Sequence, residues 1–127
     1  MSSQADLAKQ MLGLAREDLA AANALRDAEG VSASKTGFSA QQAVEKSLKA
    51  VLATQDDEFP FTHNLTLLMQ LCEDVGHPVP PDLAEADRLT PYAVAIRYGL
   101  ANPESVAPDE AVRWAARAVD WAAAKVG

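Results

Sequence analysis

The sequence has little of what marks a secreted or membrane-embedded protein. Among its 127 residues Cys72 is the one cysteine, which excludes an intrachain disulfide and gives no sign of an oxidising compartment. No stretch approaches about 18 consecutive apolar residues, the length that a membrane-spanning helix needs. The first residues show no basic segment followed by a long apolar one, as a secretory signal would. We therefore expect a cytoplasmic protein that does not contact membranes.

Basic residues are also scarce. Eleven Lys and Arg stand against eighteen Asp and Glu, so the net charge is −7. Neutralisation of phosphates by basic side chains supplies most of the affinity of general duplex binding, and polybasic faces attract anionic lipids. The charge balance therefore argues against general duplex DNA binding and against attachment to a membrane surface.

Aromatic residues make up only 6 % of the chain, and Ile96 is the sole isoleucine. Strands favour aromatic and β-branched residues, whereas alanine, which supplies much of the apolar content here, has the highest helix propensity. The length allows one domain. We therefore expect a single all-α domain spanning residues 1–127.

Glycine and proline divide the chain into helical segments. A capping box of Ser3 and Asp6 predicts the start of the first helix, and Thr62 is a candidate N-cap for the third. Thr90-Pro91 indicates either a kink or a new helix, because proline is tolerated at the first helical position but not in mid-helix. We expect helices over about residues 4–28, 38–54, 62–76, 82–98 and 108–125, with a loop over 30–37. Short connections between about five helices predict an antiparallel up-and-down bundle.

Two features bear on how the helices pack. The first helix carries two neighbouring apolar stripes, which is typical of a bundle helix with neighbours on two sides. The stripes are Leu7, Met11, Leu14, Ala21 and Leu25, and Leu12, Ala15, Leu19 and Ala22. Trp114 and Trp121 share one face of the last helix, which is suited either to burial between two subunits of a homodimer or to the core of the monomer.

The residues that most often carry chemistry are few. His63, Cys72 and His77 have no spacing of a paired metal site, so we expect no bound metal and no cofactor. The sequence lacks nucleophile-elbow, Walker and dinucleotide-binding motifs. Cys72 lies on the apolar spacing of its helix, which is typical of an inert core thiol. We therefore assign no catalytic residue.

The second helix carries the most informative pattern. Gln42, Glu45, Lys46 and Lys49 follow the spacing i, i+3, i+4 and i+7, which places them on one face. Such a face is a solvated surface, a buried polar network that fixes helix packing, or a site for an anion. The surrounding residues 31–54 favour an anion, because they carry a local charge of +2 in an acidic protein. Further candidates are Tyr92, Arg97 and Tyr98 near a later helix end.

The order of three segments resembles the HEPN domain. They are Gln41-Gln42-Ala43-Val44-Glu45-Lys46-Ser47-Leu48-Lys49-Ala50, Phe59-Pro60-Phe61-Thr62-His63-Asn64-Leu65, and Leu89-Thr90-Pro91-Tyr92 through Arg97-Tyr98. The likeness covers nearly the whole chain. It implies a helical bundle, commonly a homodimer, that binds nucleotides or RNA and is often encoded beside a minimal nucleotidyltransferase as a toxin–antitoxin pair.

Many members of the family are metal-independent ribonucleases with an Arg-x(4–6)-His motif. This sequence departs from that motif, because Asn102, Pro103 and Glu104 stand where the histidine would follow Arg97. None of them titrates near neutral pH as histidine does. His63 lies on another element, so the resemblance does not make it the catalytic histidine of that motif.

We therefore expect a non-catalytic HEPN-type module that binds a nucleotide, a minimal nucleotidyltransferase, or both. The alternatives are a ribonuclease with an altered motif and a purely structural interaction subunit. In the leading hypothesis, lysines and Arg97 meet phosphate, tyrosines stack on a base, and amide or imidazole groups bind an edge of the ligand. The predicted ligand-binding residues are Gln42, Glu45, Lys46, Lys49, His63, Tyr92, Arg97 and Tyr98.

Overall fold

A computed structural model describes residues 3–55, 59–98 and 106–127, and the backbone alone of residues 95–98. The described chain contains helices and no strand. The elements are α1 (Gln4–Asp27), α2 (Ala33–Ala53), α3 (Leu65–Asp74), the 3-10 helix η1 (Pro81–Leu89), α4 (Thr90–Tyr98) and α5 (Pro108–Val126). The prediction of an all-α bundle of about five helices is confirmed.

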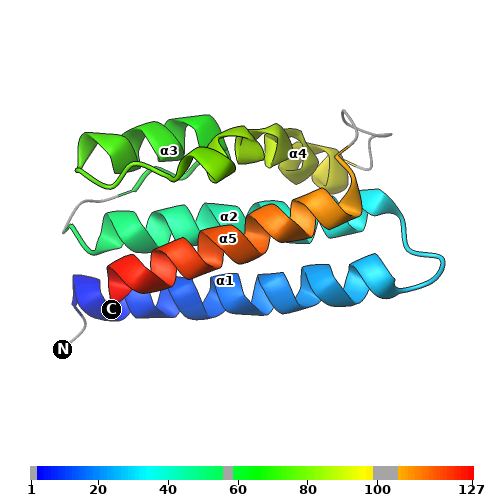
Figure 1. Cartoon of the computed structure of the whole chain (residues 1–127), viewed down its shortest axis with the longest axis horizontal. Helices are drawn as coiled ribbons and strands as arrows, with labels where there is room; N and C mark the ends of the chain where they lie inside the picture. The colour runs from blue at the N-terminus through cyan, green and yellow to red at the C-terminus, as the bar shows by residue number, and fades with distance from the viewer. Residues whose placement is uncertain (1–2, 56–58, 99–105) are drawn as a thin grey trace.

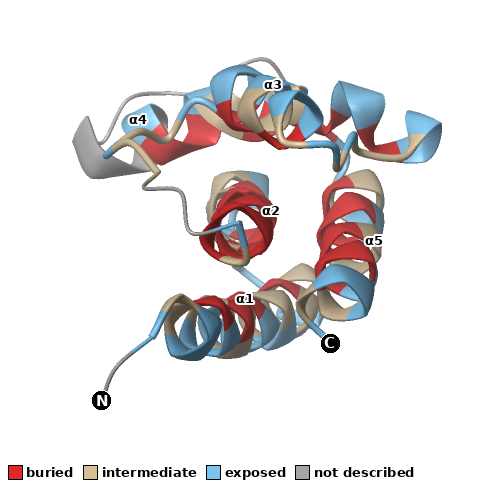
Figure 2. Ribbon diagram, turned by 90° about the vertical axis from the view of Figure 1, so that its left-hand side faces the viewer, coloured by how far each residue is buried: buried red, intermediate tan, exposed pale blue. Residues whose placement is uncertain are grey.

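Helix α2 is the centre of the bundle. In Figure 1, α1 and α2 lie side by side and run in opposite directions, and α5 crosses in front of α2. Figure 2, which looks along the bundle, shows α1 below α2, α5 on one flank, and α3 and α4 above it. The remaining flank of α2, between α1 and α4, is covered by none of the described helices. This uncovered flank is the one on which a polar face of α2 can meet solvent or a partner.

Small side chains allow the helices to pack closely around α2. The faces of α1 and α5 that contact the core carry fully buried alanines, among them Ala15, Ala22, Ala115 and Ala118. The buried leucines come mainly from α2, α3 and η1. Those that are fully buried are Leu48, Leu52, Leu65, Leu68, Leu83 and Leu89. Alanine thus provides both helix propensity and short distances between helix axes.

The predicted helix ends are partly right. Ser3 and Asp6 form the expected capping box, with the Asp6 backbone N–H donating to Ser3 Oγ over 3.2 Å. The N-cap of α3 is Asn64 rather than Thr62, because the Asn64 side chain accepts from the Leu67 backbone N–H. Thr90-Pro91 begins the new helix α4 directly after η1.

The predicted loop over residues 30–37 is wrong in its second half. Helix α2 begins at Ala33, and both Thr36 and Gly37 are buried. Serine, threonine and glycine favour turns locally, but this segment packs under Tyr92 of α4. The long-range contact overrides the local preference.

The described helices also answer the question left open about the tryptophans. Trp114 and Trp121 are 5 % and 6 % exposed within the single chain, so both belong to its core. Of the two stripes on α1, the one with Leu12, Ala15 and Ala22 is buried, whereas Leu14 in the other is exposed. In the part of the chain that the structure describes, no helix is long and apolar enough to span a membrane.

Candidate functional site

A buried carboxylate on α2 organises the polar site. Glu45 is 4 % exposed, and its two oxygens accept hydrogen bonds from different elements. Lys49 Nζ, one turn further along α2, lies 3.0 Å from Oε2. Gln41 Nε2, one turn earlier, lies 3.0 Å from Oε1, and His63 Nδ1 lies 2.7 Å from the same oxygen. Two helical neighbours and one residue before α3 thus meet at a single carboxylate.

Lys49 is itself inside the protein. It is 7 % exposed, and its Nζ lies 5.5 Å from the centroid of the Phe59 ring. Burial of an ammonium group is costly unless it is paired, and here a carboxylate and an aromatic ring face supply the compensation. Lys49 therefore contributes to the interior of the domain, where Phe59 covers the ion pair.

The same network anchors the chain between α2 and α3, which we call the 59–64 segment. Gln41 Nε2 also lies 3.2 Å from the His63 carbonyl oxygen, and Gln42 Nε2 donates to Gln41 Oε1 over 2.7 Å. The backbone and the side chain of His63 are thus both bound to α2. Phe61, two residues earlier, is fully exposed. The network therefore fixes a segment that presents an aromatic ring to solvent.

The Glu45 carboxyl is buried, and yet its pKa lies below the ordinary value. Burial by itself raises the pKa of Glu45, because it disfavours the charged form. Hydrogen bonds from Gln41, His63 and Lys49, together with the Lys49 charge, outweigh burial and hold the pKa below its ordinary value. The site therefore contains a carboxylate, not a carboxylic acid, at neutral pH.

A lowered pKa predicts an acid-sensitive fold. The stability contributed by ionised Glu45 is fully present above the pKa of the unfolded chain, about 4.3, and is lost as the pH falls through the lower folded value. We expect the free energy of unfolding of the wild type to fall more steeply below about pH 5 than that of Glu45→Gln. Urea unfolding at a series of pH values between about 3 and 7 measures this difference, and parallel curves would contradict it.

The structure separates the other predicted residues. Lys46 Nζ lies 2.6 Å from Asp18 Oδ2 of α1, and both side chains are about three-quarters buried. Tyr92 is buried against α2, and its Oη accepts a hydrogen bond from the Val106 backbone N–H over 2.8 Å. Arg97 and Tyr98 fall outside the residues whose side chains are described. The predicted set is therefore divided between a buried network around Glu45 and partly exposed positions such as Lys46.

Three residues of this arrangement did not appear among the predicted site residues. Gln41 joins Glu45 and the 59–64 segment, Phe59 covers Lys49, and Asp18 pairs with Lys46. The spacing of Gln41 and Glu45 at i, i+4 was a readable signal for the first contact. The other two contacts join separate elements, which helical spacing does not reveal.

The remaining chemistry-bearing groups are less informative. Burial raises the pKa of the Cys72 thiol to about 12, and the thiol lies 3.6 Å from the Leu48 carbonyl oxygen, in agreement with an inert core cysteine. Among the described residues, no group of three or more His, Cys, Asp or Glu is placed to hold a metal ion.

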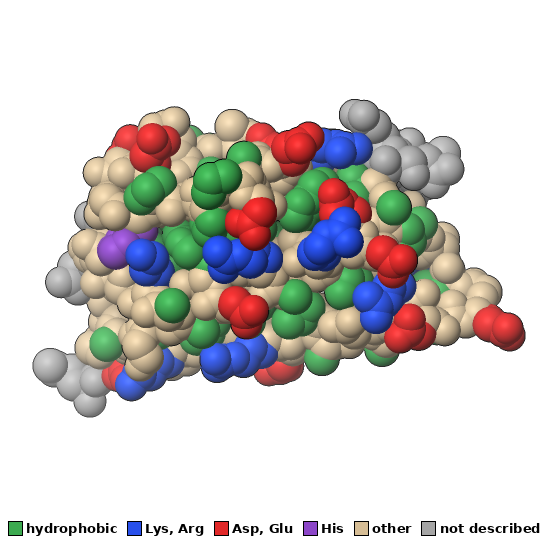
Figure 3. Space-filling model, in the orientation of Figure 1, with side chains coloured by type: hydrophobic (Ala, Val, Ile, Leu, Met, Phe, Trp, Pro, Cys, Tyr) green, Lys and Arg blue, Asp and Glu red, His purple; other side chains and the backbone are tan. Residues whose placement is uncertain are grey.

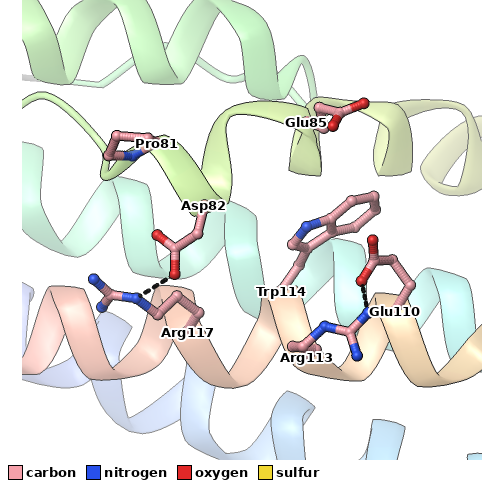
Figure 4. Close-up of a pocket in the computed structure, with 7 residues that line it drawn as sticks. All are labelled: Pro81, Asp82, Glu85, Glu110, Arg113, Trp114 and Arg117. Atoms are coloured by element: carbon pink, nitrogen blue, oxygen red, sulfur yellow. Dashed lines mark hydrogen bonds and ion pairs between the residues drawn. The ribbon is translucent and has the colours of Figure 1, made fainter.

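A second feature lies on the opposite side of α2. Figure 3 shows Lys, Arg, Asp and Glu side chains interspersed over the face that α5 and η1 form. Between these two helices is an open groove of about 330 Å³. Its lining residues are Pro81, Asp82, Glu85, Glu110, Arg113, Trp114 and Arg117. Figure 4 shows that they come from η1 on one wall and α5 on the other.

Comparison with known proteins defines the class of this helical bundle. The family model of the HEPN domain matches residues 8–125. The chain therefore belongs to the HEPN family, as the order of its motifs predicted. No protein of curated function matches the sequence.

Two solved structures share the fold. The crystal structure of ST0689, an archaeal HEPN homologue, has a TM-score of 0.70 at 21 % identity, with 100 % of both chains covered. The crystal structure of TT1696 from Thermus thermophilus has a TM-score of 0.69 at 27 % identity, with 93 % of this chain and 97 % of that chain covered. These similarities extend over essentially the whole length of the bundle.

Proposed function

We propose that this chain is a non-catalytic, cytoplasmic HEPN module that binds a minimal nucleotidyltransferase, a nucleotide, or both, on the uncovered flank of α2. The observation that carries the proposal is a difference in burial between the polar residues of α2 and the neighbouring His63. Glu45 and Lys49 are buried in the network, whereas Gln42, Lys46 and His63 are only partly buried. The flank therefore offers polar groups on a helix whose position is fixed from inside.

Each group has a role in the proposal. About a quarter of the Lys46 side chain is exposed, so its ammonium can contact an incoming anion while it remains beside Asp18. Gln42 and the 42 % exposed side chain of His63 supply hydrogen bonds to the ligand. Glu45 acts through His63, which it orients, whereas Lys49 stabilises the interior through its ion pair with Glu45. Arg97 and Tyr98, whose side chains lie outside the described residues, stay sequence-based candidates for contacts with the same ligand.

The proposal distinguishes the two lysines in one experiment. We expect Lys46→Ala to weaken ligand binding about tenfold or more, since it removes a charge-assisted contact of roughly 1.5–3 kcal/mol. Lys49→Ala should mainly lower the melting temperature and leave binding by the folded protein nearly unchanged. Calorimetry with ATP, GTP and AMP, and with a minimal nucleotidyltransferase encoded by an adjacent gene, measures binding.

Lys9→Ala is the matched control, because Lys9 is an exposed lysine on α1. It should change neither binding nor the melting temperature. Equal binding by the wild type and Lys46→Ala would place the ligand elsewhere, and absence of binding to every partner tested would overturn the proposed function.

Self-association is part of the same proposal. Both tryptophans are buried in the monomer, so a homodimer would use another face, and the exposed Leu14 marks the unburied stripe of α1 as the candidate. We expect the protein to sediment as a dimer at tens of micromolar, a concentration above ordinary dimer affinities of about 1 μM. Leu14→Glu should shift the population toward monomer. A wild-type monomer of 13.5 kDa at that concentration would contradict the expectation.

A further inference from the structure

The groove between η1 and α5 is built from two matched rows of side chains. A 3-10 helix has three residues per turn, so Asp82, Glu85 and Arg88 of η1 lie one above another. On α5 the residues at positions 110, 113, 114 and 117 follow the i, i+3, i+4, i+7 spacing of a single helix face. Charges of both signs therefore face each other across the groove.

Most of these charges already have an opposite charge beside them. Arg117 Nε lies 2.9 Å from Asp82 Oδ2 across the groove, and Arg113 pairs with Glu110 on α5. Figure 4 shows one pair on each side of the Trp114 indole. The Glu85 side chain forms no hydrogen bond or ion pair with any other described residue. Among the residues that line the groove, Glu85 is thus the charged group without an opposite charge beside it, while Arg88, the next residue in this row of η1, lies outside the lining and against Trp114.

The Trp114 indole in the groove wall, like the Glu85 carboxylate, favours a positively charged ligand. The guanidinium carbon of Arg88 lies 5.9 Å from the centroid of the Trp114 ring system. The chain therefore already places one of its own cations against this ring, in the arrangement of a cation–π contact. A second cation entering beside the indole would meet the carboxylate of Glu85.

The size of the groove limits the ligand. A volume of about 330 Å³ is at the lower end of the range for small-molecule sites, roughly 300–1,000 Å³. It suits a single side chain or a small amine. The exposed ion pairs at both ends are weak and exchange readily with solvent, so they do not close the groove.

We propose that this groove receives one cationic group, a guanidinium or an ammonium, between the Glu85 carboxylate and the Trp114 indole. The site lies on the far side of α2 from the proposed nucleotidyltransferase or nucleotide site, and does not depend on it. The cation belongs either to a basic side chain of a protein or to a free amine. Both sources share the chemistry that Glu85 and Trp114 recognise.

Nuclear magnetic resonance of the ¹⁵N-labelled protein tests the proposal. The indole N–H signals of Trp114 and Trp121 are assigned with Trp121→Phe. Methylguanidine and the peptide acetyl-Gly-Arg-Gly-amide are then titrated at constant ionic strength. We expect the Trp114 signal to shift saturably, with a dissociation constant on the order of millimolar, while the Trp121 signal stays in place. Tighter binding of the peptide would identify a protein side chain as the source, and equal binding a free amine.

Two variants make the test specific. Glu85→Gln should raise the dissociation constant at least fivefold, and the exposed position of Glu85 leaves the fold intact. Glu73→Gln removes one negative charge from the exposed surface of α3 and should leave the constant unchanged. Equal effects of the two variants, a shift produced by sodium chloride alone, or a saturable shift with inorganic phosphate in place of the guanidinium compounds would each overturn the proposal.

Discussion

Replacing Glu45 by leucine is expected to lower the free energy of unfolding by about 3–5 kcal/mol. The variant leaves the Lys49 ammonium buried without its carboxylate, 3.0 Å from where the oxygen had been. It also removes the acceptor of Gln41 Nε2 and His63 Nδ1. Urea denaturation at pH 7, followed by circular dichroism, measures the loss.

A second substitution separates the cost of the unpaired charge from that of the lost contacts. In Glu45→Leu/Lys49→Met both charges are absent, and apolar pairs of similar volume are often no less stable than a buried ion pair. We therefore expect the double variant to recover most of the loss. Glu17→Leu on the exposed face of α1 is the control and should change stability by less than about 0.5 kcal/mol. A double variant as unstable as the single one would show that Lys49 does not depend on Glu45.

These variants also separate folding from binding. If the network acts only on the interior, Glu45→Gln lowers stability and leaves ligand binding on the uncovered flank unchanged. If the network positions His63 for a ligand, the same variant weakens binding even at temperatures where the protein is fully folded. The distance of 2.7 Å between Glu45 and His63 Nδ1 makes the second result the expected one.

The fold was predictable wherever local signals and packing agree. The Ser3 capping box, the alanine-rich face of α5 and the interruption at Thr90-Pro91, predicted as either a kink or a new helix, all depend on residues close in sequence. The start of α2 was not predictable, because the residues before Phe38 favour a turn and become helical under Tyr92. Only a contact more than fifty residues away in sequence overrides that preference.

The contacts of the site within α2 were also predictable from the sequence, whereas its contacts with other elements were not. The spacing of Glu45 and Lys49 placed both on one face, and their ion pair is the expected i, i+4 contact. Helical spacing does not tell a buried face from a solvated one when both carry charges. The partners that decide this, Phe59 and Asp18, come from other elements and become neighbours only when the bundle forms.

Substitution of Gly37 by alanine is the second variant with a large expected effect. A Cβ atom at Gly37 would lie 2.5 Å from two atoms of the Tyr92 ring and 2.9 Å from a third. The ring cannot easily retreat, because it is buried and its Oη accepts from the Val106 backbone N–H. Alanine would favour the helix by up to about 1 kcal/mol, but overpacking against an anchored ring outweighs this gain. We expect a net loss of about 2–3 kcal/mol in the free energy of unfolding.

The chain supplies a matched control for this substitution. A methyl group added at Gly13, in the middle of α1, would have no neighbouring atom within 4 Å, so Gly13→Ala should raise stability by about 0.5–1 kcal/mol. Opposite signs for the same chemical change would show that the Tyr92 ring, not the backbone, decides the outcome. In a Tyr92→Leu background the smaller side chain removes the clash, and Gly37→Ala should then cost at least about 1 kcal/mol less. An unchanged cost in that background would mean that α2 itself, rather than its contact with α4, requires glycine.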